Sequence, residues 1–171
     1  NRIEDKIVAI PMKCQFRWSM VNFGLVKSLG LSATAGYDRQ WGKFSLSANA
    51  NYTCQRDRDY SSPADPEYKN TIPYSPLHSA SFILDLGYNG YSLCTSWLYT
   101  GDRFSLISNN REDMLGDWYT VDLKLNKQFH IGKHNVQATI ECNNLTDSRH
   151  EVVKRYPMPG RNWKFTLQWR I

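Results

Sequence analysis

The chain has 171 residues, of which 41% are hydrophobic, 13% aromatic and 22% charged, with a formal net charge of +5. This length suits one domain or part of one, and the composition excludes intrinsic disorder. No stretch approaches the roughly 18 consecutive apolar residues of a transmembrane helix, whereas transmembrane β-strands, with their near-average hydropathy, stay possible. The sequence starts at Asn1 without an initiator Met and without the layout of a secretory signal, so we expect a mature, processed or cut chain.

Apolar side chains fall on alternate residues along most of the chain, which predicts β-strands. A possible strand end at 7–10 precedes a looser alternating run at 23–37. Clear runs follow at 44–55, 79–88, 92–99, 119–126, 136–143 and 163–171. These seven long strands, without a comparable 3.6-residue periodicity, predict an all-β fold.

The connections between these strands alternate in length. Short ones at 38–42, 89–90 and 130–133 alternate with long polar ones at 56–76, 101–117 and 146–160. In an antiparallel meander this places tight turns at one end and long loops at the other, as in bacterial outer-membrane barrels. The run Arg56-Asp57-Arg58-Asp59 opens the first long connection, and we expect a solvated loop there. Because its bases alternate with acids, it does not predict a basic patch for nucleic acid or anionic lipid.

The apolar face of each predicted strand carries aromatic residues near its ends, as interfacial girdles do. One group lies at the long-loop end (Tyr52, Tyr99 and Tyr119) and the other at the short-turn end (Tyr37, Tyr88, Tyr91, Phe129 and Trp169). The opposite face is polar and includes Asp85, Asp122, Lys124 and Glu141, which we expect to face the lumen. The sequence therefore predicts an antiparallel transmembrane β-barrel.

No residue pattern predicts catalysis or metal binding. The four cysteines (Cys14, Cys54, Cys94 and Cys142) lie far apart and are interpreted as unpaired small hydrophobes. His130 and His134 flank a predicted turn, which does not favour a metal site. Since there is also no nucleophile elbow, phosphate loop or carboxylate pair, we expect no enzyme activity and no cofactor or metal.

Several short motifs, in order along the chain, resemble those of TonB-dependent outer-membrane receptors. Asn144-Leu145-Thr146-Asp147, then Tyr156 to Arg161, then an alternating last strand, resemble the end of such receptors. Earlier matches are Asn22-Phe23-Gly24 with Gly30-Leu31, Asn49 to Thr53, and Tyr74 to His78. The final strand (Trp163, Phe165, Leu167, Trp169 and Ile171) resembles the segment that guides barrel assembly, although Ile171 stands where an aromatic residue is usual.

The resemblance implies a barrel of about 22 strands with a plugged lumen, of which these seven to eight strands would be the carboxyl-terminal portion, 1–171. The plug domain would lie outside this chain. The implied function is energy-coupled uptake of a scarce large ligand, such as a siderophore, haem, cobalamin, glycan or peptide. The implied partners are outer-membrane lipid, the rest of the receptor and, through the plug, TonB, but no nucleic acid. The implied location is the outer membrane of a Gram-negative bacterium, with a periplasmic carboxyl terminus.

We expect the long loops to contribute to the ligand site, because aromatic and Arg side chains dominate binding hot spots. The candidates are Tyr60, Tyr68, Tyr74, Arg103, Phe104, Arg111, Arg155 and Tyr156.

Two alternatives stay open at this stage. One is a self-contained eight-stranded outer-membrane barrel with a structural or adhesive role, in which 7–10 belongs to the eighth strand and the final strand pairs with the first. The other is a soluble ligand-binding β-barrel whose apolar face points into a core.

Overall fold

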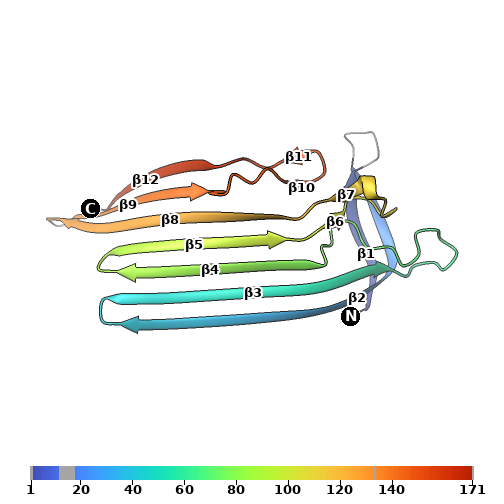
Figure 1. The fold of residues 1–171 in the computed structure, drawn as a ribbon, viewed down its shortest axis with the longest axis horizontal. Coiled ribbons are helices and arrows are strands. Elements are labelled where there is room, and N and C mark those ends of the chain that lie inside the picture. The colour runs from blue at the N-terminus through green and yellow to red at the C-terminus, as the bar shows by residue number, and fades with distance from the viewer. Residues whose placement is uncertain (1, 12–17, 133, 171) are drawn as a thin grey trace.

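The chain forms one open, antiparallel, eight-stranded sheet in strand order β1-β2-β3-β4-β5-β8-β9-β12 (Figure 1). The computed structural model describes residues 2–11, 18–132 and 134–170, so Asn1, Cys14 and Ile171 lie outside the described residues. The eight strands are β1 (Arg2–Pro11), β2 (Trp18–Trp41), β3 (Phe44–Asp59), β4 (His78–Tyr88), β5 (Tyr91–Thr100), β8 (Trp118–Ile131), β9 (His134–Asn143) and β12 (Asn162–Arg170). The predicted all-β architecture is confirmed.

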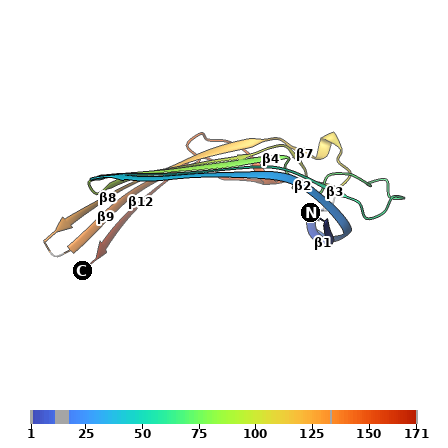
Figure 2. The ribbon, with the colours of Figure 1, turned by 90° about the horizontal axis from the view of Figure 1, so that it is seen from below.

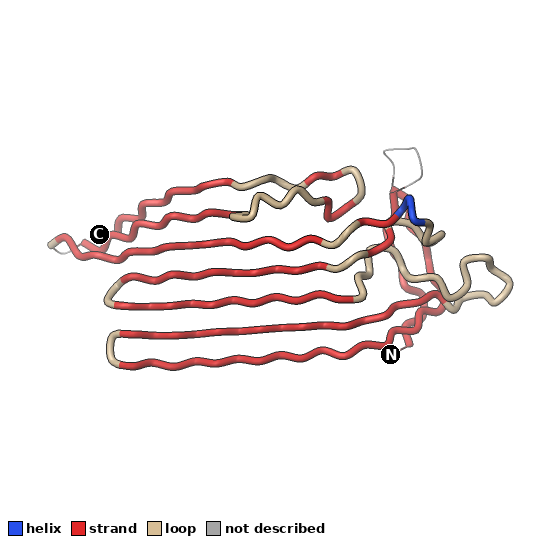
Figure 3. The backbone as a smooth tube through the Cα atoms, in the orientation of Figure 1, coloured by secondary structure: helices blue, strands red, loops and turns tan. Residues whose placement is uncertain are grey.

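Tight turns and long connections lie at opposite ends of this sheet, as the sequence predicts (Figure 3). The second turn is Asn89-Gly90, where both residues have positive φ, as a type I′ hairpin requires. The long connections contain two small hairpins, one of β6 (Arg103–Phe104) with β7 (Met114–Leu115) and one of β10 (Glu151–Val153) with β11 (Tyr156–Pro157). A single 3-10 turn, η1 (Arg111–Asp113), precedes β7. Within the described residues, no helix has the length and hydropathy needed to cross a membrane.

Several predicted strands are too short. The sequence predicts only a possible strand end at 7–10, whereas β1 extends over the whole of Arg2–Pro11. The turn predicted at 38–42 is limited to Gly42-Lys43, because β2 continues to Trp41.

The largest correction concerns Arg56 to Asp59, which forms the end of β3 and not a solvated loop. Asp57 is buried there, but it accepts hydrogen bonds from Gln55 Nε2 at 2.7 Å and Ser75 Oγ at 2.8 Å. Lys6 Nζ lies 3.8 Å from the same carboxylate. Because these partners replace water around the buried acid, the strand can continue through the charged run.

The strand register aligns the aromatic residues of the apolar face into two rows. Tyr52 pairs with Ala80, Ala80 with Tyr99, and Tyr99 with Tyr119, which forms the row at the long-loop end. The row at the turn end contains Phe44, Tyr88 and Tyr91. Along β3 the two rows are separated by the eight residues from Phe44 to Tyr52, or about 27 Å. At a strand tilt of 35–45° this distance corresponds to roughly 19–22 Å across the membrane. This height approaches the apolar band of about 25 Å in outer-membrane barrels.

The apolar face is not covered by any other layer of the described chain, because the sheet is a single curved layer (Figure 2). Leu29 is 80% exposed and Phe165 is 73% exposed, whereas the buried apolar cluster contains only Phe23, Val26 and Ile72. A soluble barrel would bury this face, so the soluble alternative is contradicted. The strands β1 and β12 lie at opposite edges of the sheet and do not pair within the described residues, which also contradicts the self-closed alternative.

A charge introduced midway between the two aromatic rows should destabilise the protein in a bilayer. Leu84 lies at this midpoint, in the row of Ala48, Thr95 and Leu123. We expect Leu84→Arg to lower the free energy of unfolding in lipid vesicles by about 2–4 kcal/mol, as measured by urea titration. The matched control is Ile83→Arg, on the opposite face of the same strand, which should change it by less than half as much. Equal losses at both positions would contradict the assignment of the faces.

Candidate ligand-binding loops

The three long connections lie at one end of the sheet, and the first two are joined by hydrogen bonds. Asn109 Oδ1 accepts from the backbone N–H of Thr71 at 2.7 Å, and Asn109 Nδ2 donates to the carbonyl of Thr71 at 3.0 Å. The backbone N–H of Tyr74 donates to the carbonyl of Phe104 at 2.7 Å. This paired amide contact resembles a short piece of β-ladder, so the two loops are held as one unit.

Arg103 joins the second loop to the third. Its side chain is almost fully buried, and its guanidinium donates to the backbone carbonyls of Gly116, Glu151 and Val152. Burial lowers the pKa of Arg103 below its ordinary value. Three carbonyls in two loops compensate part of the cost of burying this charge.

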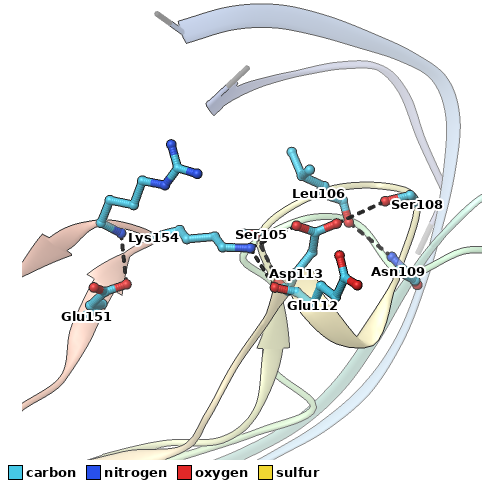
Figure 4. Close-up of polar contacts among 9 residues, drawn as sticks. Ser105, Leu106, Ser108, Asn109, Glu112, Asp113, Glu151 and Lys154 are labelled. Carbon is cyan, nitrogen blue, oxygen red and sulfur yellow. Dashed lines mark hydrogen bonds and ion pairs between the residues drawn. The ribbon is translucent and has the colours of Figure 1, made fainter. Parts of the chain in front are cut away.

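A second connection between these loops is an ion pair (Figure 4). Lys154 Nζ lies 2.8 Å from Asp113 Oδ1 and donates to the carbonyl of Glu112 at 2.7 Å. Asp113 is buried, and its own carbonyl accepts from Ser105 Oγ at 2.9 Å. Ring stacking of Trp118 on His150, with centroids 4.2 Å apart, adds a contact between the start of β8 and the third loop.

The two motifs near the carboxyl end contact each other directly. Asp147 Oδ1 accepts from the backbone N–H of Arg161 at 2.9 Å, and a Cβ at Gly160 would lie 2.8 Å from the same oxygen. Asn144 is buried and donates to the carbonyls of Ser148 and Pro159. The two motif segments therefore form one compact support for the third loop, and a side chain at 160 would displace the Asp147 carboxylate from this position.

The predicted ligand-binding residues differ widely in exposure. Arg111, Arg155 and Tyr156 are exposed, Tyr60, Tyr68, Tyr74 and Phe104 are half-buried, and Arg103 is buried. The geometry gives Arg103 a structural role, because its donors are directed at loop carbonyls. Tyr60 and Tyr68 form an edge-to-face pair with centroids 5.4 Å apart. Burial raises the pKa of the Tyr74 hydroxyl, and this oxygen has no hydrogen-bond partner among the described residues.

The four charged residues predicted to face the lumen all lie on the polar face of the sheet. Glu141 pairs with Lys124 at 3.0 Å and with Lys164 at 3.5 Å, so the ion pairs extend across β8, β9 and β12. Asp122 accepts from the backbone N–H of Asn144 at 2.7 Å. Asp85 is exposed on the same face, opposite Ser47 in register.

The last strand is regular and carries its apolar residues on the exposed face. Trp163, Phe165, Leu167 and Trp169 are exposed, and each lies opposite a residue of β9 in register.

The sequence interpretation missed the residues that hold the loops together: Ser105, Asn109, Asp113, Trp118, His150 and Lys154. Asn109 has a positive φ, for which asparagine is a favoured residue, so the pair Asn109-Asn110 was a readable turn signal. The pairing of Lys154 with Asp113 depends on contacts between distant segments, and no local sequence pattern predicts it.

The described residues contain no group of three or more His, Cys, Asp or Glu side chains arranged to hold a metal ion. Cys54, Cys94 and Cys142 are free and lie on β3, β5 and β9.

Comparison with protein families places the chain in a defined class. The model of the β-barrel of TonB-dependent receptor-like proteins matches residues 1–145, so the chain belongs to this family. It is therefore a piece of a β-barrel of the outer membrane of a Gram-negative bacterium, and its relatives are receptors and not enzymes.

Two solved structures have a similar fold. One is BauA, the ferric preacinetobactin receptor from Acinetobacter baumannii, with a TM-score of 0.69, 11% identity and coverage of 96% of this chain and 25% of that chain. The other is FyuA, the ferric yersiniabactin uptake receptor from Yersinia pestis, with a TM-score of 0.52, 12% identity and coverage of 96% of this chain and 31% of that chain. The chain thus spans less than a third of the length of these structures. No curated protein matched the sequence.

Removal of the Arg103 guanidinium should loosen the third loop. Arg103→Ala leaves the carbonyls of Glu151 and Val152 without this donor, at a cost of about 1–3 kcal/mol. We expect faster hydrogen exchange of the backbone amides of 151–156, measured by mass spectrometry. The control Arg111→Ala removes an exposed guanidinium and should leave this exchange unchanged. Unchanged exchange in Arg103→Ala would show that the loop contact does not depend on Arg103.

Proposed function

We propose that the chain is part of a TonB-dependent outer-membrane receptor that takes up a scarce ligand too large for porins. The observation that carries this proposal is the combination of an exposed apolar belt with three joined loops at one end of the sheet. A structural barrel needs the belt, but it does not need long loops that are ordered by buried charges and cross-loop hydrogen bonds.

In this proposal the whole of 1–171 is the carboxyl-terminal portion of the barrel domain, and the remaining strands complete a barrel of about 22 strands. The plug is a separate domain inside the barrel and transmits the action of TonB. The polar face, with Asp85, Asp122, Lys124 and Glu141, lines the lumen and contacts the plug or the solute. The tight turns and the carboxyl terminus are periplasmic, and the exposed alternation of the last strand guides assembly.

The ligand surface is formed by the exposed tips of the second and third loops. The exposed Arg111 and Arg155 supply two cations, whereas Arg103 holds the loops in place. The exposed Tyr156 supplies an aromatic ring, whose centroid lies 6.3 Å from that of Trp18. Because the two similar structures are receptors for ferric complexes, ferric siderophores are the first ligand class to test. Haem, cobalamin, glycans and peptides follow in the same panel.

Truncation of the exposed loop residues should reduce uptake without affecting the barrel. We expect the combined variant Arg111→Ala, Arg155→Ala, Tyr156→Ala, made in the complete receptor, to reduce TonB-dependent accumulation of the labelled ligand at least tenfold, since hot-spot residues contribute more than about 1 kcal/mol each. The control Asp38→Ala, Lys43→Ala changes exposed residues at the opposite end and should leave accumulation unchanged. Normal accumulation by a loop variant that is present at the cell surface would refute this ligand surface, and failure of every ligand in the panel would refute the uptake function.

A further inference from the structure

The charged run at the end of β3 is divided between the two faces of the sheet. Because successive residues of a strand point to opposite faces, Arg56 and Arg58 share the apolar face, whereas the buried Asp57 and Asp59 lie on the other. Register places Lys27 of β2 directly opposite Arg58, and Leu29 opposite Arg56. Three cations therefore lie together on the apolar face, although the sequence shows equal numbers of bases and acids here.

These three cations are not neutralised by acids in the described part of the chain. No ion pair is formed by Lys27, Arg56 or Arg58 with any described acid. Lys27 Nζ instead lies 4.3 Å from the ring centroid of Tyr60, and Arg58 Nε is buried without a hydrogen-bond partner. Glu4, on the adjacent β1, is already paired with Arg2 at 2.8 Å. An anion on this face would thus meet an excess of positive charge.

The three cations lie just beyond the aromatic row at the long-loop end. Arg56 follows Tyr52 by four residues of the same strand, or about 13 Å. Aromatic rows mark the boundary between hydrocarbon and headgroups, so the cations are at headgroup level. Basic residues at this level attract anionic lipid headgroups, each contributing about fivefold in affinity.

The apolar face is hollowed on the membrane side of these cations. A groove of about 550 Å³ crosses β2, β3, β4, β5 and β8, with a floor that includes Ala33, Ala35, Ala50 and Ala80. Phe82 and Trp97 form its walls, with their rings edge to face and centroids 6.4 Å apart. Small side chains between large ones make a depression that holds an acyl chain in a fixed place, where a uniform belt would offer only mobile contacts.

We propose that this surface is a binding site for one outer-leaflet lipid with a phosphorylated headgroup, of the lipid A type. Its phosphate binds Lys27, Arg56 and Arg58, and one acyl chain lies in the alanine groove. The assignment to the outer leaflet rests on the proposed orientation, with the long loops outside the cell. The site is on the outer surface of the barrel, on the face opposite to the proposed solute path.

The test uses the complete receptor in detergent micelles, with lipid occupancy measured by native mass spectrometry. The probes are bisphosphorylated lipid A, the same lipid without phosphate, and inorganic phosphate. We expect the wild type to bind the phosphorylated lipid at least tenfold more tightly than the dephosphorylated lipid. Arg56→Gln with Arg58→Gln should weaken its binding about 30-fold, and Ala50→Leu, which fills the groove, at least fivefold.

Two matched controls separate this site from general effects of charge and volume. Arg39→Gln removes a cation on the same face near the short turns, and Ala48→Leu enlarges an alanine that does not line the groove. Both should bind lipid as the wild type does. Equal affinity for the two lipids, or displacement of the lipid by inorganic phosphate, would overturn the proposal. Ligand uptake is measured on the same variants, so loss of lipid binding with normal uptake leaves the proposed transport function intact.

Discussion

The need to satisfy backbone hydrogen bonds without water governs this structure. In hydrocarbon every unpaired N–H or C=O costs several kcal/mol, so a spanning sheet must pair each strand with neighbours on both sides. The strands from β3 to β9 meet this requirement through continuous antiparallel pairing, whereas β2 from Ser28 to Trp41 pairs only with β3 within the described residues. In such a paired sheet, successive side chains of each strand point to opposite faces. Every second side chain therefore contacts lipid, and the others lie in a polar environment.

The same constraint separates the two kinds of polar contact in the molecule. On the polar face, Glu141 is held by cations from neighbouring strands, in the manner of cross-strand pairs. In the loops, Arg103 and Asp113 are buried and have partners from other loops. Contacts of the first kind follow from register alone, whereas those of the second kind order segments that the ladder does not reach. The loops therefore keep a defined shape although they lie outside the sheet.

Much of the sheet could be predicted from the sequence, because period two is a local signal and Asn89-Gly90 is a local turn. The end of β3 could not, since charged residues usually indicate a loop. The buried Asp57 is stabilised there by contacts with the distant residues Ser75 and Lys6, which no local pattern predicts. The sequence could identify which loop residues are of types that often bind ligands, but it could not show which of them are exposed to a ligand and which hold the loops together. Arg103 and Arg111 look alike in sequence, yet one is buried among carbonyls and the other is exposed.

The run from Arg56 to Asp59 shows why charge patterning depends on secondary structure. In an irregular loop, alternating bases and acids neutralise one another over a few ångströms, and no patch results. In a strand, the same order places all bases on one face and all acids on the other. Asp57 and Asp59 accept hydrogen bonds from Gln55 and Ser61 and form no ion pair with the arginines, which lie on the apolar face. A balanced sequence thus produces a cationic surface at the edge of the apolar belt, where an anionic lipid headgroup would meet it.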